Sequence, residues 1–570
     1  MTFPNTIERK LKMKKNLRSL RASGKFVYYL PILVFLLSAL ASAAITWYIS
    51  GNLLDADASS ELVLAKHLAD TRQLLSRDWV YSTELRVFQM QLVFAPLMLF
   101  LDSWRLVRFL GTMILQSLYV LSFVYMARKA GFRRQTIWYG AALLLLPVSV
   151  TYGRIVLYHC YYLTYITMSF FMYGMVLDLY QNWDPRQLRS WVMTGVLMLI
   201  SFLSGTNSVR QLMITHVPML FSIFLLCLRQ DTPESPQAAL LSKPALRAFG
   251  FALLAAACSF AALLFNQRVL QKYYMDNPYY SESTLLMDPS QLNDMIYGFL
   301  HQFGFRRYVP LISLFGLLSI GSIAAFGYTL YVSGKTLFPA GQGGPAPRSL
   351  VNLGFFSYTV VMTAVFLITA DPTCYFPLYL SLSWPWAVIP LVEALGRNPG
   401  KYAPLHRGRL FAWAAALVVL CSGWLNAAWF TGSIQTEQRY EGLWYQNPDT
   451  VPQLSGATAF LTDNGYEIGY ATYWNANIVT ELTDGAVQMI GLEESDDPEG
   501  GVRYYTFLTS LWLREVPNEK PFLLVPFDTL EQEWAFPEEM EPYCELVYAD
   551  DWYQIYDVTD FEQFQVLLYS

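Results

Sequence analysis

Two aspartates, Asp55 and Asp57, follow directly on a long apolar run near the start of the chain. The segment after them places Leu62, Ala65 and Leu68 at helical spacing, which predicts a helix lying at a membrane surface. A carboxylate within hydrogen-bond reach of a hydroxyl can remove its proton as a general base. An aspartate before a helix can also act as an N-cap, which accepts hydrogen bonds from the first free amides. The sequence leaves both roles open for this pair.

Three arginines fall at the ends of predicted membrane spans on the side of the two aspartates: Arg108, Arg154 and Arg210. The guanidinium fork suits anionic oxygens such as those of a phosphate, and it also serves as an interfacial anchor or as a partner of an aspartate. His216 follows Arg210 in "SGTNSVRQLMITH", a polar break between two apolar runs. Backbone amides and Arg210 can meet a phosphate there, although a plain connector is the alternative.

The composition indicates a polytopic membrane protein. Apolar residues make up 54% of the chain, charged residues 15% and aromatic residues 16%, and the mean hydropathy is +0.29. The six cysteines are scattered without metal-ligand or disulfide spacing. The sequence contains neither a glycine-rich nucleotide cradle nor a basic, aromatic-interleaved patch, which argues against nucleotide-sugar donors and nucleic acid.

Apolar runs of about 20 residues predict eleven membrane spans. They lie near residues 27–49, 109–127, 135–153, 155–177, 190–209, 211–228, 248–267, 309–333, 350–370, 374–392 and 410–430. Eight Lys/Arg in residues 1–25 and basic connectors between the spans predict a cytoplasmic N-terminus. The segment 87–101 has only fifteen residues and contains Pro96, so it predicts a re-entrant or interfacial helix.

The sequence predicts two domains. Residues 1–430 form the membrane domain, with outer loops 50–103 and 266–308, and residues 431–570 form an extracytoplasmic α/β domain. The second domain carries 26 Asp/Glu against 4 Lys/Arg, as suits a solvated surface. Short strands are expected around a helix at 475–485, at residues 465–474, 486–492, 521–527, 545–550 and 552–558.

The first loop resembles that of the GT-C glycosyltransferases, which include protein mannosyltransferases and lipid A aminoarabinose transferases. In that family the first outer loop begins with an Asp, often Asp-Glu, and an Ala follows about eight positions later; Asp57 and Ala65 match this pattern. The "APL" at 95–97, Arg108 at the start of the second span and the basic turn "RKAGFRR" are also similar. The chain departs from the family in having Ala58 where many members have Glu, and Glu61 where an aromatic residue is common.

The resemblance implies an inverting hexosyltransferase that takes a sugar from a polyprenyl-phosphate donor in the cell membrane. Either Asp57 or Asp55 is then the base, and Arg108, Arg210 and Arg154 are candidates for the donor phosphate. His216 and Glu282 join the substrate-binding candidates, with a bundle histidine and a solvated carboxylate as alternatives. By analogy, the loop 266–308 that carries Glu282 is a substrate lid. The implied acceptor is a cell-envelope glycan or protein; no cofactor is indicated, and the metal requirement is left open.

Two other classes of function remain open from the sequence. One is a transporter or flippase for a lipid-linked glycan. The scarcity of charged residues near the bilayer midplane and the lack of half-repeat symmetry in the hydropathy argue against it. The other is a non-catalytic membrane protein with an outer interaction domain, although eleven spans exceed what an anchor requires.

Overall fold

The computed structural model describes residues 6–82, 85–160, 162–228, 243–275, 286–338, 346–368, 376–396, 407–431, 450–494, 502–527 and 538–569. Within them, eight helical stretches are long and apolar enough to cross a bilayer: Tyr29–Asn52, Trp104–Lys129, Leu188–Gly205, Val209–Cys227, Leu246–Tyr274, Leu314–Leu337, Pro347–Ile368 and Leu410–Ala428. Large apolar side chains such as Leu37 and Leu40 are exposed on the outside of these helices, as a lipid-facing surface requires. The chain is a polytopic helical membrane protein, as its composition predicts.

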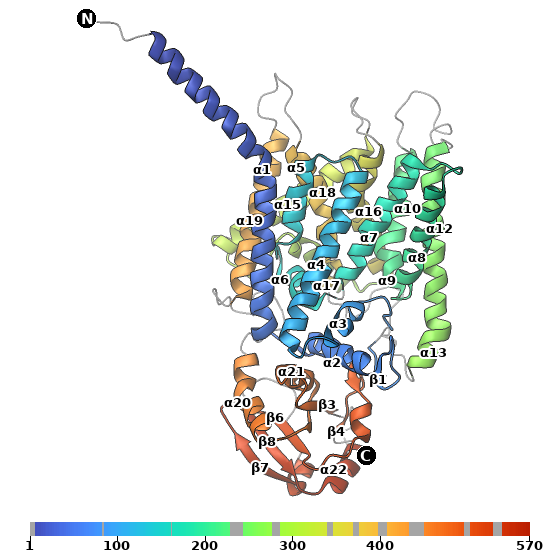
Figure 1. Cartoon of the computed structure of the whole chain (residues 1–570), viewed down its shortest axis with the longest axis vertical. Coiled ribbons are helices and arrows are strands. Elements are labelled where there is room, and N and C mark those ends of the chain that lie inside the picture. Colours follow the sequence, from blue (N-terminus) through green and yellow to red (C-terminus); the bar gives the residue numbers. More distant parts are fainter. Residues whose placement is uncertain are drawn as a thin grey trace, which may run out of the picture.

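The helices form one bundle (Figure 1). Its long members are α1 (Thr6–Asn52), α4 (Trp104–Lys129), α5 (Arg134–Leu144), α7 (Leu163–Asn182), α8 (Leu188–Gly205), α10 (Val217–Leu228), α12 (Lys243–Phe265), α15 (Leu314–Gly334), α16 (Ala346–Ile368), α18 (Ser383–Gly396) and α19 (Arg407–Phe430). They correspond in order to the eleven predicted spans. Because α5, α7 and α18 are not among the eight stretches above, the predicted number of spans is not confirmed.

The predicted continuous span over residues 135–153 is wrong, because α5 ends at Leu144. Its eleven residues rise only about 16 Å, roughly half of the hydrocarbon thickness. Pro147 follows and has no backbone N–H with which to continue a helix. The chain then forms the short helix α6 (Val150–Arg154) and the π-helix η1 (Ile155–His159) before α7 begins. Most of this interrupted segment is buried in the bundle, as irregular backbone at membrane depth must be.

Two short helices cover the end of the bundle that faces the C-terminal domain (Figure 1). The helix predicted after Asp57 is α2 (Ala56–Thr71), but it does not lie free on a membrane surface. Helix α3 (Gln91–Met98) packs against it from the bundle side, and α21 (Tyr473–Leu482) packs against it from the other side, so most of α2 is buried. The eight residues of α3 rise about 12 Å, too little to cross a bilayer, in agreement with the prediction for residues 87–101.

The C-terminal domain is built on a six-stranded sheet with the order β4-β3-β2-β6-β8-β7. The strands are β2 (Ile468–Thr472), β3 (Gln488–Glu494), β4 (Val502–Tyr504), β6 (Phe522–Pro526), β7 (Cys544–Ala549) and β8 (Tyr553–Val558). Strand β2 pairs in parallel with β3 and β6, and α21 is the crossover from β2 to β3. All five strands expected from the sequence are present; β4 was not predicted.

Helices cover both faces of this sheet. The buried side chains of α20 (Thr450–Asp463) and α21 pack against one face, with Leu454 and Val479 in the same cluster as Phe522. Those of α22 (Phe561–Tyr569) pack against the other face, where Phe564 meets Tyr470. The domain therefore has its own core, which leaves α21 free to present its remaining side to the membrane domain.

The C-terminal domain is fastened to the first loop. Strand β1 (Trp79–Val80) lies in that loop and pairs antiparallel with β5 (Thr509–Ser510) of the C-terminal domain. His67 of α2 stacks on Trp512, with ring centroids 3.8 Å apart and planes 9° apart. These contacts join segments that are more than four hundred residues apart in the chain.

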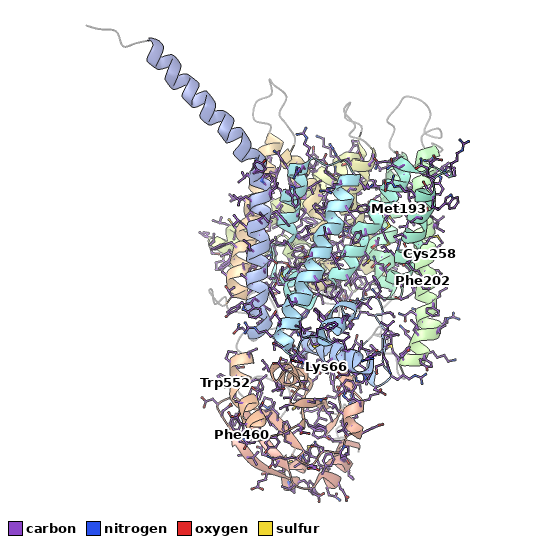
Figure 2. The ribbon with its side chains drawn as sticks, in the orientation of Figure 1. Lys66, Met193, Phe202, Cys258, Phe460 and Trp552 are labelled. Carbon is purple, nitrogen blue, oxygen red and sulfur yellow. The ribbon has the colours of Figure 1, made fainter. Side chains whose placement is uncertain are left out.

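The start of α1 and the C-terminal domain lie at opposite ends of the bundle (Figure 1). Figure 2 shows Lys66 of α2 at the junction of the two domains, with Met193 and Cys258 in the bundle and Trp552 in the C-terminal domain. That the N-terminus and the C-terminal domain are on different sides of the membrane stays a prediction. That the C-terminal domain is the extracytoplasmic part stays a prediction.

Candidate active site

Asp55 is the N-cap of α2. Its backbone is extended, and its Oδ1 accepts a hydrogen bond of 2.8 Å from the amide of Ala58. Its Oδ2 lies 2.8 Å from Nη2 of Arg154 and 2.6 Å from Nε2 of His159. Burial alone would raise the pKa of Asp55, but the charges of His159 and Arg154 outweigh burial and hold this pKa well below its usual range. Both carboxylate oxygens of Asp55 are therefore engaged in hydrogen bonds or ion pairs. Arg154, which was predicted to bind the donor phosphate, forms an ion pair with Asp55 instead.

We expect Asp55→Asn to lower stability. Asparagine keeps an acceptor for the Ala58 amide but removes the charge facing Arg154, and breaking a buried ion pair costs about 3 kcal/mol or more. Because the pKa of Asp55 is lower in the folded chain than in the unfolded chain, this contribution is present above about pH 5 and shrinks as the pH falls below about 4. Unfolding in detergent at pH 7 and pH 3 should show a smaller difference between wild type and variant at pH 3; an equal difference at both would contradict the assignment.

Asp57 lies in the first turn of α2 and has a different environment. It is half-buried, and its Oδ1 accepts a hydrogen bond of 2.6 Å from the hydroxyl of Tyr473. Within the described residues no other hydrogen bond to the Asp57 carboxylate is found. Asp57 therefore keeps one carboxylate oxygen available, which Asp55 does not.

Tyr473 comes from the C-terminal domain, where it is the first residue of α21. Its ring stacks on Tyr505, with centroids 4.2 Å apart and planes 17° apart. Burial, reinforced by the neighbouring Asp57 carboxylate, raises the pKa of Tyr473 well above its ordinary value. Tyr473 therefore stays protonated and acts as a hydrogen-bond donor to Asp57.

Glu61 lies one turn beyond Asp57 on the same face of α2. It accepts a hydrogen bond of 3.2 Å from Nη2 of Arg86 and a second from the side-chain amide of Gln91. Burial raises the pKa of Glu61, and the charge of Arg86 opposes this rise. Arg86 was not among the candidates predicted from the sequence, because the residues around it form no recognisable binding motif.

Arg210 lies near this group. Its Nη1 donates a hydrogen bond of 2.6 Å to the hydroxyl of Tyr162, and its guanidinium is 5.2 Å from the ring centroid of Tyr379. It is close enough to Arg86 for the two charges to interact. Ser208, two residues earlier, has a φ of 136°, a strained conformation of the kind that clusters at functional sites. Arg86, which pairs with Glu61 of α2, and Arg210 together make a positive region suited to an anionic group.

Arg108 has a different environment from the one expected. It is fully buried and binds Glu481 of α21 through two hydrogen bonds, the one from Nε being 2.6 Å long. Its Nη2 also lies 3.0 Å from the carbonyl oxygen of Ala58. These contacts favour a role in joining α4, α2 and α21 over the predicted role in binding a phosphate. The amide of Trp104, one turn earlier, supports this junction by donating to Asp484.

The remaining candidates lie apart from this group or cannot be placed. Glu282 falls outside the described residues. His216 is fully buried at the end of the π-helix η2 (Leu212–His216), and neither ring nitrogen has a hydrogen-bond partner within the described residues. Its predicted role in substrate binding therefore has no contact that supports it. The loop 266–308 touches the first loop at its start, where Asn266 donates to the carbonyl of Leu85, but nothing tests its role as a lid.

A cavity of about 370 Å³ lies beside the row of carboxylates. Leu64 and Leu68 of α2 line it, and they continue the helix face that carries Asp57 and Glu61, because these positions are three or four residues apart. Arg86 also lines this cavity. The other lining residues come from the end of α2, the following loop and α3 and are mostly apolar: Ala69, Arg72, Gln73, Leu74, Leu75, Tyr81, Val87, Gln91, Leu92, Ala95, Pro96 and Leu99.

A metal site is not evident in the described part of the chain. No group of three or more His, Cys, Asp or Glu side chains is arranged there to hold a metal ion.

Comparisons with known proteins give structural likenesses only. No protein-family model and no curated protein matches the chain. Among solved structures, the apo oligosaccharyltransferase of Archaeoglobus fulgidus is 12% identical with a TM-score of 0.47; the match covers 81% of this chain, which spans 64% of that one. ArnT from Cupriavidus metallidurans in the apo state is 10% identical with a TM-score of 0.48, covering 94% of this chain and 98% of that chain.

Two further structures of these proteins contain lipid phosphates. Archaeal AglB from Archaeoglobus fulgidus, in complex with an inhibitory peptide and a dolichol-phosphate, is 11% identical with a TM-score of 0.47 and covers 88% of this chain and 70% of that one. ArnT from Cupriavidus metallidurans bound to undecaprenyl phosphate is 9% identical with a TM-score of 0.44, and the match covers 92% of this chain and 97% of that chain.

Proposed function

We propose that this chain is a membrane glycosyltransferase that moves a sugar from a polyprenyl-phosphate donor to an acceptor hydroxyl, with Asp57 as the general base. The observation that carries the proposal is the division of roles between the two aspartates. Asp55 has both oxygens engaged by Ala58, Arg154 and His159, whereas Asp57 has one oxygen held by Tyr473 and is half-buried at the start of α2. A held, ionised carboxylate at the edge of a membrane domain suits proton removal from a hydroxyl.

The reaction is a single displacement. Asp57 takes the proton of the acceptor hydroxyl as the acceptor oxygen forms a bond to the anomeric carbon. The bond between that carbon and the donor phosphate oxygen breaks, and the polyprenyl phosphate leaves with the bonding electrons. The configuration at the anomeric carbon is therefore inverted. The acceptor belongs to the cell-envelope glycans or proteins.

Arg86 and Arg210 supply the positive charge that an anionic leaving group requires. Arg86 pairs with Glu61, one turn from Asp57, and also lines the mostly apolar cavity between α2 and α3. Arg210 is close enough to Arg86 for their charges to interact. A polyprenyl-phosphate sugar has a sugar, a phosphate and an isoprenoid chain in this order. The α2 carboxylates suit the sugar, Arg86 and Arg210 suit the phosphate, and the apolar cavity suits the isoprenoid chain. Dolichol phosphate and undecaprenyl phosphate, present in the structures of AglB and ArnT, belong to this class of lipid.

A donor-release assay tests the proposal. Purified protein is incubated with a panel of radiolabelled polyprenyl-phosphate sugars and scored for loss of label from the lipid. We expect release from at least one member of the panel. Transbilayer movement of a labelled lipid in proteoliposomes without any loss of label would instead favour the transporter or flippase. No release and no movement would favour the non-catalytic interaction protein.

We expect Arg210→Lys to impair turnover more than stability. Lysine keeps the positive charge but replaces a fork of paired donors by a point charge, so the phosphate of the leaving group loses a hydrogen bond in the transition state. The rate should fall roughly tenfold or more, the effect of losing one hydrogen bond to a charged group. The matched control is Arg189→Lys, since Arg189 is exposed and pairs with Asp178. Equal turnover in the two variants would show that Arg210 is an interfacial anchor.

A further inference from the structure

The C-terminal domain reaches the candidate base directly. The hydroxyl of Tyr473 donates to Oδ1 of Asp57 across 416 positions of sequence, at a distance of 2.6 Å. Tyr473 follows immediately on β2, so its place is set by the central part of the sheet. The membrane domain therefore does not complete the environment of Asp57 by itself.

The position of Tyr473 is fixed from two directions. Its ring is stacked on Tyr505, which belongs to the segment after β4. The far end of the same helix is held to the membrane domain by the buried pair of Arg108 and Glu481 and by the bond from the Trp104 amide to Asp484. A side chain held at both its ring and its helix loses little further freedom when it binds a carboxylate, so it can fix the orientation of that carboxylate.

The hydrogen bond from Tyr473 to Oδ1 of Asp57 also fixes the direction in which the second oxygen, Oδ2, points. With Oδ1 held by Tyr473, the carboxylate cannot turn about its last torsion without losing a charge-assisted hydrogen bond. Proton transfer depends on geometry within a few tenths of an ångström, so a turning carboxylate spends less of its time in the productive orientation. Asp55, two residues away, is held by the membrane domain instead, through Arg154 and His159.

We infer that Tyr473 is a positioning residue for Asp57, through which the C-terminal domain takes part in the transfer reaction. The inference rests on the proposed function, since it assigns a role relative to the base of that reaction. It goes beyond that function because the C-terminal domain becomes part of the reaction site.

The test compares Tyr473→Phe with Tyr466→Phe. Each substitution removes a hydroxyl that donates to an aspartate and keeps the ring, but the hydroxyl of Tyr466 is bonded to Asp557 and not to Asp57. We expect Tyr473→Phe to lower kcat about tenfold with little change in the KM for the donor, and Tyr466→Phe to leave both near wild type. Protease resistance of the junction between the domains should be equal in the two variants.

A double-mutant cycle separates positioning from a structural role. If Tyr473 acts through Asp57, adding Tyr473→Phe to Asp57→Asn should cause no further loss of rate, whereas independent effects would multiply. A kcat for Tyr473→Phe equal to that for Tyr466→Phe, or multiplying effects in the cycle, would overturn the positioning role while leaving Asp57 as the base. Full activity of Asp57→Asn alone would overturn the proposed base and this inference together.

Discussion

Replacing Asp57 with asparagine should lower the rate of sugar transfer by ~10²–10⁴-fold, the usual cost of losing a general base. Asparagine has nearly the same shape and still accepts the hydrogen bond from Tyr473, but it cannot take a proton. Folding should stay near normal, because no ion pair to Asp57 is found within the described residues. Transfer rates at equal amounts of folded protein, judged by thermal unfolding, measure this effect.

Two other aspartates of the same region serve as controls. Asp70→Asn changes a carboxylate on α2 that is exposed and paired with Lys66, and it should leave transfer unchanged. Asp55→Asn should lower stability more than the rate measured on the folded fraction. If Asp57→Asn retained activity while folded Asp55→Asn lost it, the base would be Asp55; if neither mattered, the enzyme assignment would fail.

Removing Arg108 should destabilise the protein by about 3–5 kcal/mol, because Arg108→Ala leaves Glu481 buried without its partner. The contacts of Arg108 join α4 to α21, so the junction between the membrane domain and the C-terminal domain should also open. Thermal unfolding in detergent and limited proteolysis of this junction measure the two effects.

Arg105→Ala is the matched control for this change. Arg105 lies one turn before Arg108 on α4, but it is only half-buried, over the ring of Trp47, and should be replaceable with less loss. The double change Arg108→Met with Glu481→Leu should recover most of the stability, since it removes both buried charges. A stable Arg108→Ala variant with weakened donor binding would restore the phosphate role that the sequence predicted.

The parts of this fold that depend on local pattern could be predicted from the sequence. Strands such as Phe522–Pro526 are short apolar runs between turn residues, and the helix Tyr473–Leu482 ends shortly before a glycine. The helix after Asp57 follows from the spacing of Leu62, Ala65 and Leu68. Its burial does not follow, because the partner helix α21 is four hundred residues away in the chain.

The contacts that assign roles could not be predicted, since they join residues remote in sequence. Arg108 and Glu481 are 373 positions apart, and no local pattern pairs them. His159 and Asp55 are 104 positions apart, and no local pattern pairs them either. The span 135–153 was predicted from its apolar length alone, and that criterion does not register Pro147, which follows the end of α5 at Leu144.

The measurement that tests the central claim most directly is the anomeric configuration of the transferred sugar. With a donor of known configuration, identified by the release assay, the product is isolated and its anomeric coupling constant is measured by NMR. A single displacement assisted by Asp57 predicts inversion at the anomeric carbon. Retention would require a covalent or otherwise two-step route and would contradict the role assigned to Asp57.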